Sequence, residues 1–375
     1  MNSLRENSQW LLAGLFTGAG CLTACLLLTT LAALFIFGFQ PGPAPIARPS
    51  ISQSPTPQSP LPQSPTPTPS ISNPQSPIST PPIPSSSTPT ISNPQSPISP
   101  PSGLIVYTCF NAPFDDICAV DPAGGNVRRL TDAAATDFYP EISPRGDLLT
   151  FSSRRSGEFR IYVMDLDGGN VRQVGPDGGS QFAPDIAPDG TQIVFTNAFA
   201  GTDGRYQNIW VMNVDGSDAH PLTTGSHNDV DPVWSPGGRQ IAFSSDRGWR
   251  PAHWIMDADG QNMRMLPDDV AEHGGRSDWS PDGRWLAFYA GPRDDRDIYL
   301  LATDGSGETR RLTTGGRNLA PAFSPDGNWI VFTSYREADN AELYIMRSDG
   351  SDVRRLTFDD RADWQPRWGP QSTTP

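Results

Sequence analysis

Ala-Pro-Ala-Phe-Ser-Pro-Asp-Gly at 320–327, followed by Trp-Ile-Val-Phe-Thr-Ser at 329–334, is the stretch that decides the fold of this chain. The same unit continues with Glu-Leu-Tyr-Ile-Met at 342–346 and Arg-Arg-Leu-Thr at 354–357. Its Ser-Pro or Ala-Pro landmark recurs 44 to 48 residues apart, at Pro144, Pro188, Pro236, Pro281 and Pro325. A fixed period of this length predicts a repeat architecture.

Each copy contains four short apolar or alternating runs separated by turn residues, a pattern typical of β-strands. The first run ends at Ser-Pro-x-Gly, where proline presets φ and glycine supplies a positive φ. The third run ends at an Asp-Gly pair, which favours a tight hairpin turn. A four-stranded meander cannot bury both of its faces alone. Stacking such units around an axis buries them, so the repeats predict a β-propeller.

The two ends of the repeat region supply one blade together. Residues 104–131 contain only the second, third and fourth strands of a copy, and the missing first strand occurs at 363–368. Pairing these segments would close the ring and remove the open sheet edges that invite aggregation. With five complete copies and one shared copy, we predict an all-β, six-bladed β-propeller over residues 104–370.

Several motifs carry a family resemblance. Ser-Pro-Asp-Gly occurs at 280–283 and 324–327, Phe-Thr-Ser-x-Arg at 332–336, and Arg-Arg-Leu-Thr at 310–313 and 354–357. These residues resemble the WD40-like (PD40) repeats of the TolB family, and the resemblance covers essentially all of residues 104–370. It implies a six-bladed propeller. It also implies that metal binding in the central channel is compatible with the fold.

The N-terminal region differs in composition from the repeats. After a short tail at 1–9, residues 10–39 carry no charge, and this stretch exceeds the ~20 residues needed to span a bilayer, so we predict a transmembrane anchor. A cleaved signal peptide and a lipoprotein signal ending at Cys25 are alternatives. Residues 40–103 contain 21 of the chain's 40 prolines, which predicts a disordered, semi-extended stalk. Residues 371–375 form a short tail.

The charge of the chain restricts its partners. Of the charged residues, 27 are basic and 41 are acidic, which gives a formal net charge of −14. Because binding to nucleic acid requires a basic surface, we expect no DNA or RNA partner. Cys109 and Cys118 lie on adjacent strands of the first hairpin, and in an oxidising compartment they could form a disulfide. Two buried free thiols are the alternative.

Two sets of polar residues are predicted on the innermost strands, which line the channel of a propeller. The first set lies three positions before the proline within the inner strand (Pro140 for Asp137), or at the aligned residue, and contains Asp137, Gln181, Asp229, Gly274, Asn318 and Asp363. Its three carboxylates, Asp137, Asp229 and Asp363, could bind Ca²⁺. A water-filled polar channel is the alternative. The second set, predicted to contact a partner together with Gln181 and Asn318, contains Tyr139, Asp231, Arg276 and Gln365.

Three arginines and two histidines occupy recurring or adjacent positions in the repeats. Arg155, Arg247 and Arg336 share one repeat position, and we expect them to brace neighbouring blades through an aspartate. His227 and His273 begin adjacent inner strands and could meet, but no third metal ligand is evident. Neither a Gly-x-Ser-x-Gly elbow nor a His-Glu-x-x-His motif occurs in the chain.

The sequence therefore predicts a membrane-anchored, extracytoplasmic propeller that acts as a non-catalytic protein-binding module of the bacterial cell envelope. Its ligand, an envelope protein or peptide, is expected at the mouth of the channel, and the propeller itself is expected to be monomeric. The alternative is a metal-dependent, carbohydrate-active enzyme. Oligogalacturonate lyases resemble the same propeller and use a histidine-bound metal.

Overall fold

A computed structural model describes residues 100–201, 204–248, 250–337 and 340–370. The predicted anchor at 10–39, nearly all of the predicted stalk at 40–103 and the tail at 371–375 lie outside these residues. None of the described residues forms a helix with the length and apolar character that crossing a membrane requires.

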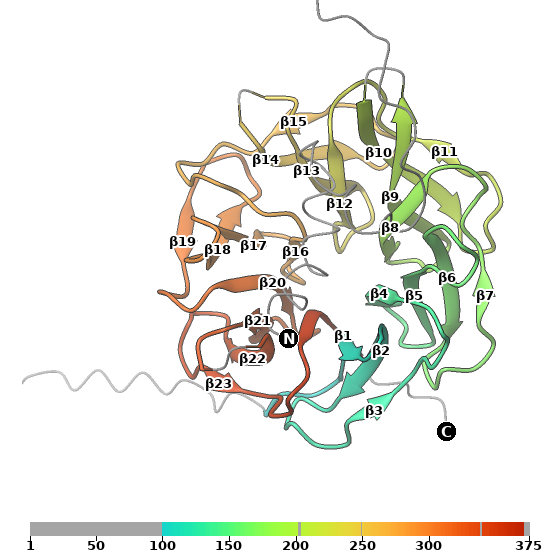
Figure 1. Ribbon diagram of the computed structural model, residues 1–375. Helices are drawn as coiled ribbons and strands as arrows, with labels where there is room; N and C mark the ends of the chain where they lie inside the picture. Colours follow the sequence, from blue (N-terminus) through green and yellow to red (C-terminus); the bar gives the residue numbers. More distant parts are fainter. Residues whose placement is uncertain (1–99, 202–203, 249, 338–339, 371–375) are drawn as a thin grey trace, which may run out of the picture. The chain divides into compact units, whose positions relative to one another are not determined.

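The described residues form six four-stranded antiparallel sheets, the blades of a closed propeller (Figure 1). Blade 1 consists of β24 (Asp363–Gly369), β1 (Leu104–Asn111), β2 (Phe114–Val120) and β3 (Arg128–Arg129). Blade 2 consists of β4 (Asp137–Ile142), β5 (Leu148–Ser153), β6 (Arg160–Asp165) and β7 (Arg172–Gln173). Blade 3 consists of β8 (Ser180–Ile186), β9 (Gln192–Gly201), β10 (Gly204–Asn213) and β11 (His220–Pro221).

The remaining blades follow the same order. Blade 4 consists of β12 (Asp229–Trp234), β13 (Gln240–Ser245), β14 (Ala252–Asp257) and β15 (Arg264–Met265). Blade 5 consists of β16 (Asp278–Trp279), β17 (Trp285–Ala290), β18 (Asp297–Ala302) and β19 (Thr309–Arg311). Blade 6 consists of β20 (Asn318–Phe323), β21 (Trp329–Ser334), β22 (Glu342–Arg347) and β23 (Arg354–Arg355).

Blade 1 confirms the predicted closure of the ring. The strand β24 pairs with β1 in an antiparallel register that places Leu104 opposite Gly369 and Ile105 opposite Trp368. The first strand of each blade lies nearest the centre of the ring (Figure 1). We call the face on which these first strands begin the loop face, and the opposite face, which carries the Ser-Pro-x-Gly turns, the turn face.

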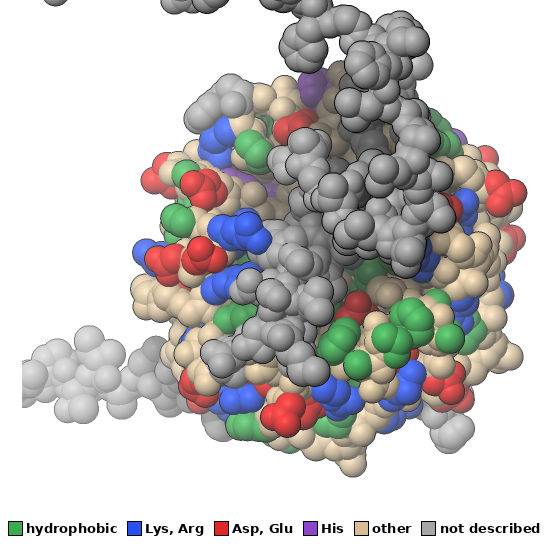
Figure 2. Space-filling view, in the orientation of Figure 1, with side chains coloured by type: hydrophobic (Ala, Val, Ile, Leu, Met, Phe, Trp, Pro, Cys, Tyr) green, Lys and Arg blue, Asp and Glu red, His purple; other side chains and the backbone are tan. Residues whose placement is uncertain are grey.

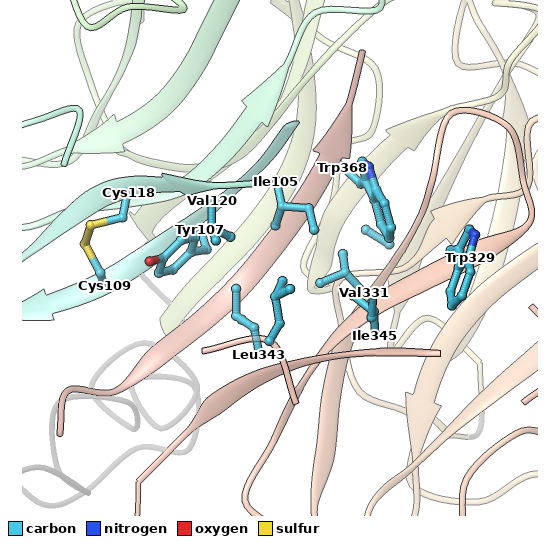
Figure 3. Close-up of a cluster of buried hydrophobic side chains, with 12 residues drawn as sticks. Ile105, Tyr107, Cys109, Cys118, Val120, Trp329, Val331, Leu343, Ile345 and Trp368 are labelled. Atoms are coloured by element: carbon cyan, nitrogen blue, oxygen red, sulfur yellow. A yellow bond between two sulfur atoms is a disulfide. The ribbon is translucent and has the colours of Figure 1, made fainter. Parts of the chain in front are cut away.

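The hydrophobic core lies between the blades rather than within one sheet. Between blades 6 and 1, Ile105 and Tyr107 pack with Val331, Ile345 and Trp368, and the exposed fraction of all five side chains is 7% or less (Figure 3). Equivalent clusters fill the other junctions. Burying each sheet face against its neighbour is the stabilising interaction that a single blade cannot provide.

The Arg and Thr side chains of the Arg-Arg-Leu-Thr motif connect two strands of the blade. In blade 6, Thr357 Oγ1 accepts the backbone N–H of Leu343 at 3.0 Å and donates to Glu342 at 2.7 Å. Arg355 forms an ion pair with the same carboxylate at 2.8 Å. The motif therefore ties the short fourth strand to the start of the third, where few backbone hydrogen bonds are available. The same set recurs in blade 5, at Asp297, Arg311 and Thr313.

Cys109 and Cys118 form a disulfide between β1 and β2, with their Cα atoms 5.8 Å apart. Both residues are buried in blade 1.

Replacing both cysteines by serine is expected to lower the free energy of unfolding by about 2–3 kcal/mol, because the bond closes a short loop in the unfolded chain. Urea unfolding of the wild type and the double variant, each with and without reductant, measures this. Reductant should lower the stability of the wild type toward that of the variant. Equal stability of all four samples would contradict the expectation.

Candidate binding site in the channel

Two carboxylates of the first inner-strand set, Asp137 and Asp229, form their hydrogen bonds and ion pairs within their own blades. Asp229 accepts a hydrogen bond from Ser245 at 2.6 Å and forms an ion pair with Arg247. Asp137 forms the equivalent ion pair with Arg155 at 2.8 Å. Asp137 and Asp229 have no exposed surface. These residues therefore brace the first two strands of one blade to each other.

The third predicted arginine, Arg336, forms the same brace with a neutral acceptor, since it donates to Asn318 Oδ1 at 3.0 Å. Each guanidinium also lies over two aromatic rings, such as Phe243 and Trp254 beneath Arg247. We expected these arginines to brace neighbouring blades; the structure instead pairs each with a residue of its own blade, because the second strand ends beside the start of the first.

The three predicted metal ligands lie in different blades. Asp137 belongs to blade 2, Asp229 to blade 4 and Asp363 to blade 1, and the first two are engaged by arginines. Among the described residues, no group of three or more His, Cys, Asp or Glu side chains is arranged to hold a metal ion. The structure thus does not bring these carboxylates together as a site.

Asp363 differs from the other members of its set. It faces Cys109, which stands where blade 4 has Ser245, and Asn111 stands where blade 4 has Arg247. Within the described part of the chain, neither of its carboxylate oxygens has a hydrogen-bond partner. Burial, reinforced by the negative charge of Asp359, raises the pKa of Asp363 to about 8.

Gln181 and Asn318 instead link neighbouring blades, since Gln181 of blade 3 contacts blade 2 and Asn318 of blade 6 contacts blade 5. Gln181 accepts the backbone N–H of Ile161 at 3.2 Å and donates to the carbonyl of Pro176 at 2.7 Å. Asn318 donates to Asp297, Thr313 and Gly315. Both residues are fully buried, so they stabilise the blades rather than present a surface to the channel.

The second predicted set forms a ring around the channel, two residues further along each first strand. A β-bulge interrupts the register here, for example between Phe138 and Glu141 in blade 2. The residue at each of the six equivalent positions has a positive φ, between 41° and 58°. We call these residues the bulge ring, and its members are Tyr139, Ala183, Asp231, Arg276, Ala320 and Gln365.

Hydrogen bonds between neighbouring blades hold the bulge ring in place. The backbone N–H of Arg276 donates to Asp231 Oδ2 at 2.9 Å, and that of Tyr139 donates to Gln365 Oε1 at 3.3 Å. Gly275 allows the first of these contacts, because a Cβ at this position would lie 1.8 Å from Asp231 Oδ2. All four predicted partner-contacting residues of this set thus converge in one layer.

A second layer of ionisable side chains lies toward the turn face, two residues further along the strands. Asp185 accepts the backbone N–H of Trp234, and Asp278 accepts that of Phe323, each at 2.7 Å. Glu141 forms an ion pair with Arg367 at 2.6 Å. Burial raises the pKa of all three carboxyl groups.

One arginine of each layer contacts a distant blade: Arg276 in the bulge ring and Arg367 in the second layer. Arg276 of blade 5 donates to the carbonyl of Pro140 in the opposite blade at 2.8 Å. Arg367 of blade 1 donates to the carbonyl of Ser277 in blade 5 at 3.1 Å. Both side chains are buried, and each contacts a blade that is not a neighbour of its own.

An aromatic cluster adjoins the ring on the loop face. Phe138, Tyr139, Phe159 and Phe182 pack with ring centroids 4.8 to 6.5 Å apart, and all but Phe138 are partly exposed. Figure 2 shows hydrophobic side chains gathered over β4 and β5, beside the centre of the ring. The mouth therefore combines an apolar side with polar bulge-ring residues. Phe159 could not be predicted from the repeats, because it lies in a loop outside their pattern.

The histidines pair differently from the expectation. His273 packs against His253, with ring centroids 5.1 Å apart, and both rings contact Phe288. His227 instead lies 3.8 Å from Asp246. His253 has no exposed surface, and burial, aided by the nearby His273, lowers its pKa well below the usual value.

This burial predicts a loss of stability in acid. The unfolded chain takes up a proton on His253 near pH 6.5, whereas the folded chain does not, so stability falls as the pH drops below 6.5. Between pH 7.5 and 5.5 the wild type should lose about 1.4 kcal/mol more than the variant His253→Gln. Urea unfolding at both pH values measures the difference, and equal losses would refute it.

Comparison with known proteins agrees with this architecture. The family model described as TolB beta propeller domain matches residues 92–203, 179–271 and 268–374. The protein TolB homolog of Chlorobium luteolum is 32% identical over 266 residues, which are 70% of this chain and 59% of that protein. The Tol-Pal system protein TolB of Anaeromyxobacter dehalogenans is 32% identical over 28% of this chain and 23% of its own length.

A solved structure is similar to the whole propeller. The crystal structure of TolB from Acinetobacter baumannii has a TM-score of 0.64 and 23% identity, and the match covers 73% of this chain and 68% of that one. At this identity the similarity concerns the fold. The family model, in contrast, matches well over half of the sequence. The chain therefore belongs to the TolB β-propeller domain family.

Proposed function

We propose that this chain is a membrane-anchored, extracytoplasmic TolB-like propeller that serves as a non-catalytic protein-binding module of the bacterial cell envelope. A segment of an envelope protein would occupy the loop-face mouth. The bulge ring carries this proposal, because six strained backbone positions direct side chains of different chemistry into one layer of the channel. Strain of this kind tends to persist at functional sites.

The contents of the channel support recognition in preference to catalysis. The carboxylates of the deeper layer are each held by a backbone N–H or by Arg367, so their positions are fixed. Rigid polar groups beside an aromatic cluster are the combination that protein interfaces use for specificity. The chain spans 59% of its relative from C. luteolum, so a partner cannot be transferred from that protein.

The relatives support an envelope setting. The name of the A. dehalogenans relative assigns that protein to the Tol-Pal system. A role for this chain in a comparable assembly is part of the proposal. The apolar stretch at 10–39 would anchor the chain, and the proline-rich segment that follows would hold the propeller away from the membrane.

Protease treatment of cells tests the proposed topology. Cleavage within residues 40–103 should release the folded propeller from intact cells or, for a periplasmic location, from spheroplasts. Release that occurs only after the inner membrane is lysed would place the propeller on the cytoplasmic side.

Affinity capture tests the binding function. Full-length protein in detergent, wild type or with Tyr139→Ala, is used to capture partners from envelope extract. The control is Val353→Ala, which alters a residue that is 39% exposed on the outer edge of blade 6. A partner retained by the wild type and the control but lost by Tyr139→Ala supports the mouth as the site. Equal capture by all three proteins would place binding elsewhere.

A further inference from the structure

The two arginines of the channel differ in their counter-ions. Arg367 pairs with Glu141 at 2.6 Å and donates to two backbone carbonyl groups. Arg276 forms no ion pair with any residue that the structure describes, although its exposed fraction is only 4%. A buried guanidinium without a carboxylate is unfavourable, so this residue requires an explanation that Arg367 does not.

The hydrogen bonding of Arg276 is also incomplete. Its Nη2 atom donates to the carbonyl of Pro140 at 2.8 Å, and its guanidinium lies 5.0 Å from the ring centroid of Tyr139. Its Nε atom is buried without an acceptor among the described residues. Burial, together with the positive charge of Arg367, lowers the pKa of Arg276 to about 10. The free protein therefore holds a cation whose surroundings do not fully stabilise it.

The nearby carboxylates cannot supply the missing partner without losing their own. Asp231 Oδ2 accepts the backbone N–H of Arg276, and Glu141 is bound to Arg367. Their charges act on Arg276 only at longer range. Moving either carboxylate would leave a buried donor without an acceptor, at a cost of about 1–3 kcal/mol. No carboxylate among the described residues is therefore free to act as the counter-ion of Arg276.

The position of Arg276 fits a bound carboxylate. It belongs to the bulge ring, the channel layer nearer the loop face, and Asp231 and Gln365 of the same ring are partly exposed. The planar guanidinium can bind a carboxylate through two parallel hydrogen bonds. The adjacent aromatic cluster could cover the apolar part of the same ligand.

We propose that Arg276 binds a carboxylate of the peptide segment that occupies the loop-face mouth. The partner segment is thus acidic at the residue that enters the channel most deeply. The carboxylate belongs either to an Asp or Glu side chain or to a C-terminus. This proposal rests on the proposed binding function and adds the chemical class of its ligand.

The thermal stability of two variants shows whether Arg276 binds a ligand or stabilises the fold. If Arg276 awaits a counter-ion, the variant Arg276→Gln should melt within about 2 °C of the wild type, because it removes an unpaired buried charge. The matched variant Arg367→Gln should melt many degrees lower, since it leaves Glu141 unpaired. An equal loss of thermal stability in the two variants would assign Arg276 a structural role and overturn the proposal.

Peptide binding tests the proposal directly, with full-length protein in detergent and fluorescein-labelled hexapeptides. Four pools of otherwise identical sequence are compared. Two pools contain Asp or Glu and two contain the neutral Asn or Gln, and one pool of each kind has a free C-terminus while the other has an amidated one. Fluorescence anisotropy at fixed ionic strength measures the affinities. We expect a carboxylate-containing pool to bind most tightly. Arg276→Gln should weaken that binding by about 30-fold or more, the equivalent of about 2 kcal/mol.

The possible outcomes distinguish failure of the acidic-ligand proposal from failure of the proposed binding function. Comparison of the pools shows whether a side chain or a C-terminus supplies the carboxylate. Equal affinity for the fully neutral pool, or unchanged affinity of Arg276→Gln for acidic peptides, would overturn the proposal while leaving the binding function intact. Failure of every pool to bind would count against both. Arg276→Lys, which keeps the charge without the planar fork, should give intermediate affinity.

Discussion

Replacing Arg367 by glutamine is expected to lower the free energy of unfolding by about 3–5 kcal/mol, because Glu141 would remain in the channel without its cation. The exposed fractions of the two side chains are 6% and 13%, so water cannot replace the lost partner efficiently. The same guanidinium also donates to Ser277 and Pro321, which belong to blades 5 and 6. Urea unfolding monitored by tryptophan fluorescence measures the change.

A double variant controls for this interpretation. Combining Arg367→Met with Glu141→Leu removes both charges and keeps most of the volume, so it should recover most of the lost stability. A double variant that is as unstable as Arg367→Gln would show that the carbonyl contacts, and not the ion pair, account for the loss.

Arg247→Ala is expected to cost about 3–5 kcal/mol, whereas Arg336→Ala should cost only about 1–2 kcal/mol. Both arginines occupy the same position in their blades and stack on equivalent aromatic pairs. Their acceptors differ, since Asp229 is a buried carboxylate and Asn318 a neutral amide with other hydrogen-bond partners. Only the first substitution leaves a charge unpaired in the interior.

The comparison controls for packing, because both substitutions remove the same side chain from similar surroundings. Adding Asp229→Asn to Arg247→Ala should restore about 2 kcal/mol or more, since it replaces the unpaired charge by an amide. Equal costs for the two single variants would show that aromatic stacking, and not charge pairing, determines the stability of the brace.

The repeats made the architecture predictable because each copy repeats its turn chemistry in register. Pro325 and Gly327 form the same turn as their counterparts in other blades, and the segment at 363–368 could only complete the blade that lacked a first strand. These features depend on local backbone preferences and on pattern matching between copies. Both can be recognised in a single sequence.

The channel was only partly predictable, because the bulge changes which residues face the axis. Strict alternation would direct Asp137, Tyr139 and Glu141 to one face of β4. The bulge between Phe138 and Glu141 instead leaves Asp137 within the blade, beside Arg155, while Tyr139 reaches the channel. The residue type at the centre of the bulge does not mark it, since this position holds residues as different as Tyr, Ala, Asp, Arg and Gln; the proline that follows in five of the six blades is the shared signal.

The pairing of β24 with β1 also has a consequence for biosynthesis. About 250 residues separate the two strands, so the ring cannot close until β24 has been synthesised. Until β24 arrives, β1 presents an unpaired edge and the core between blades 6 and 1 lacks Trp368. Such edges recruit other chains. The last strand therefore sets the time at which a nascent propeller stops requiring protection from aggregation.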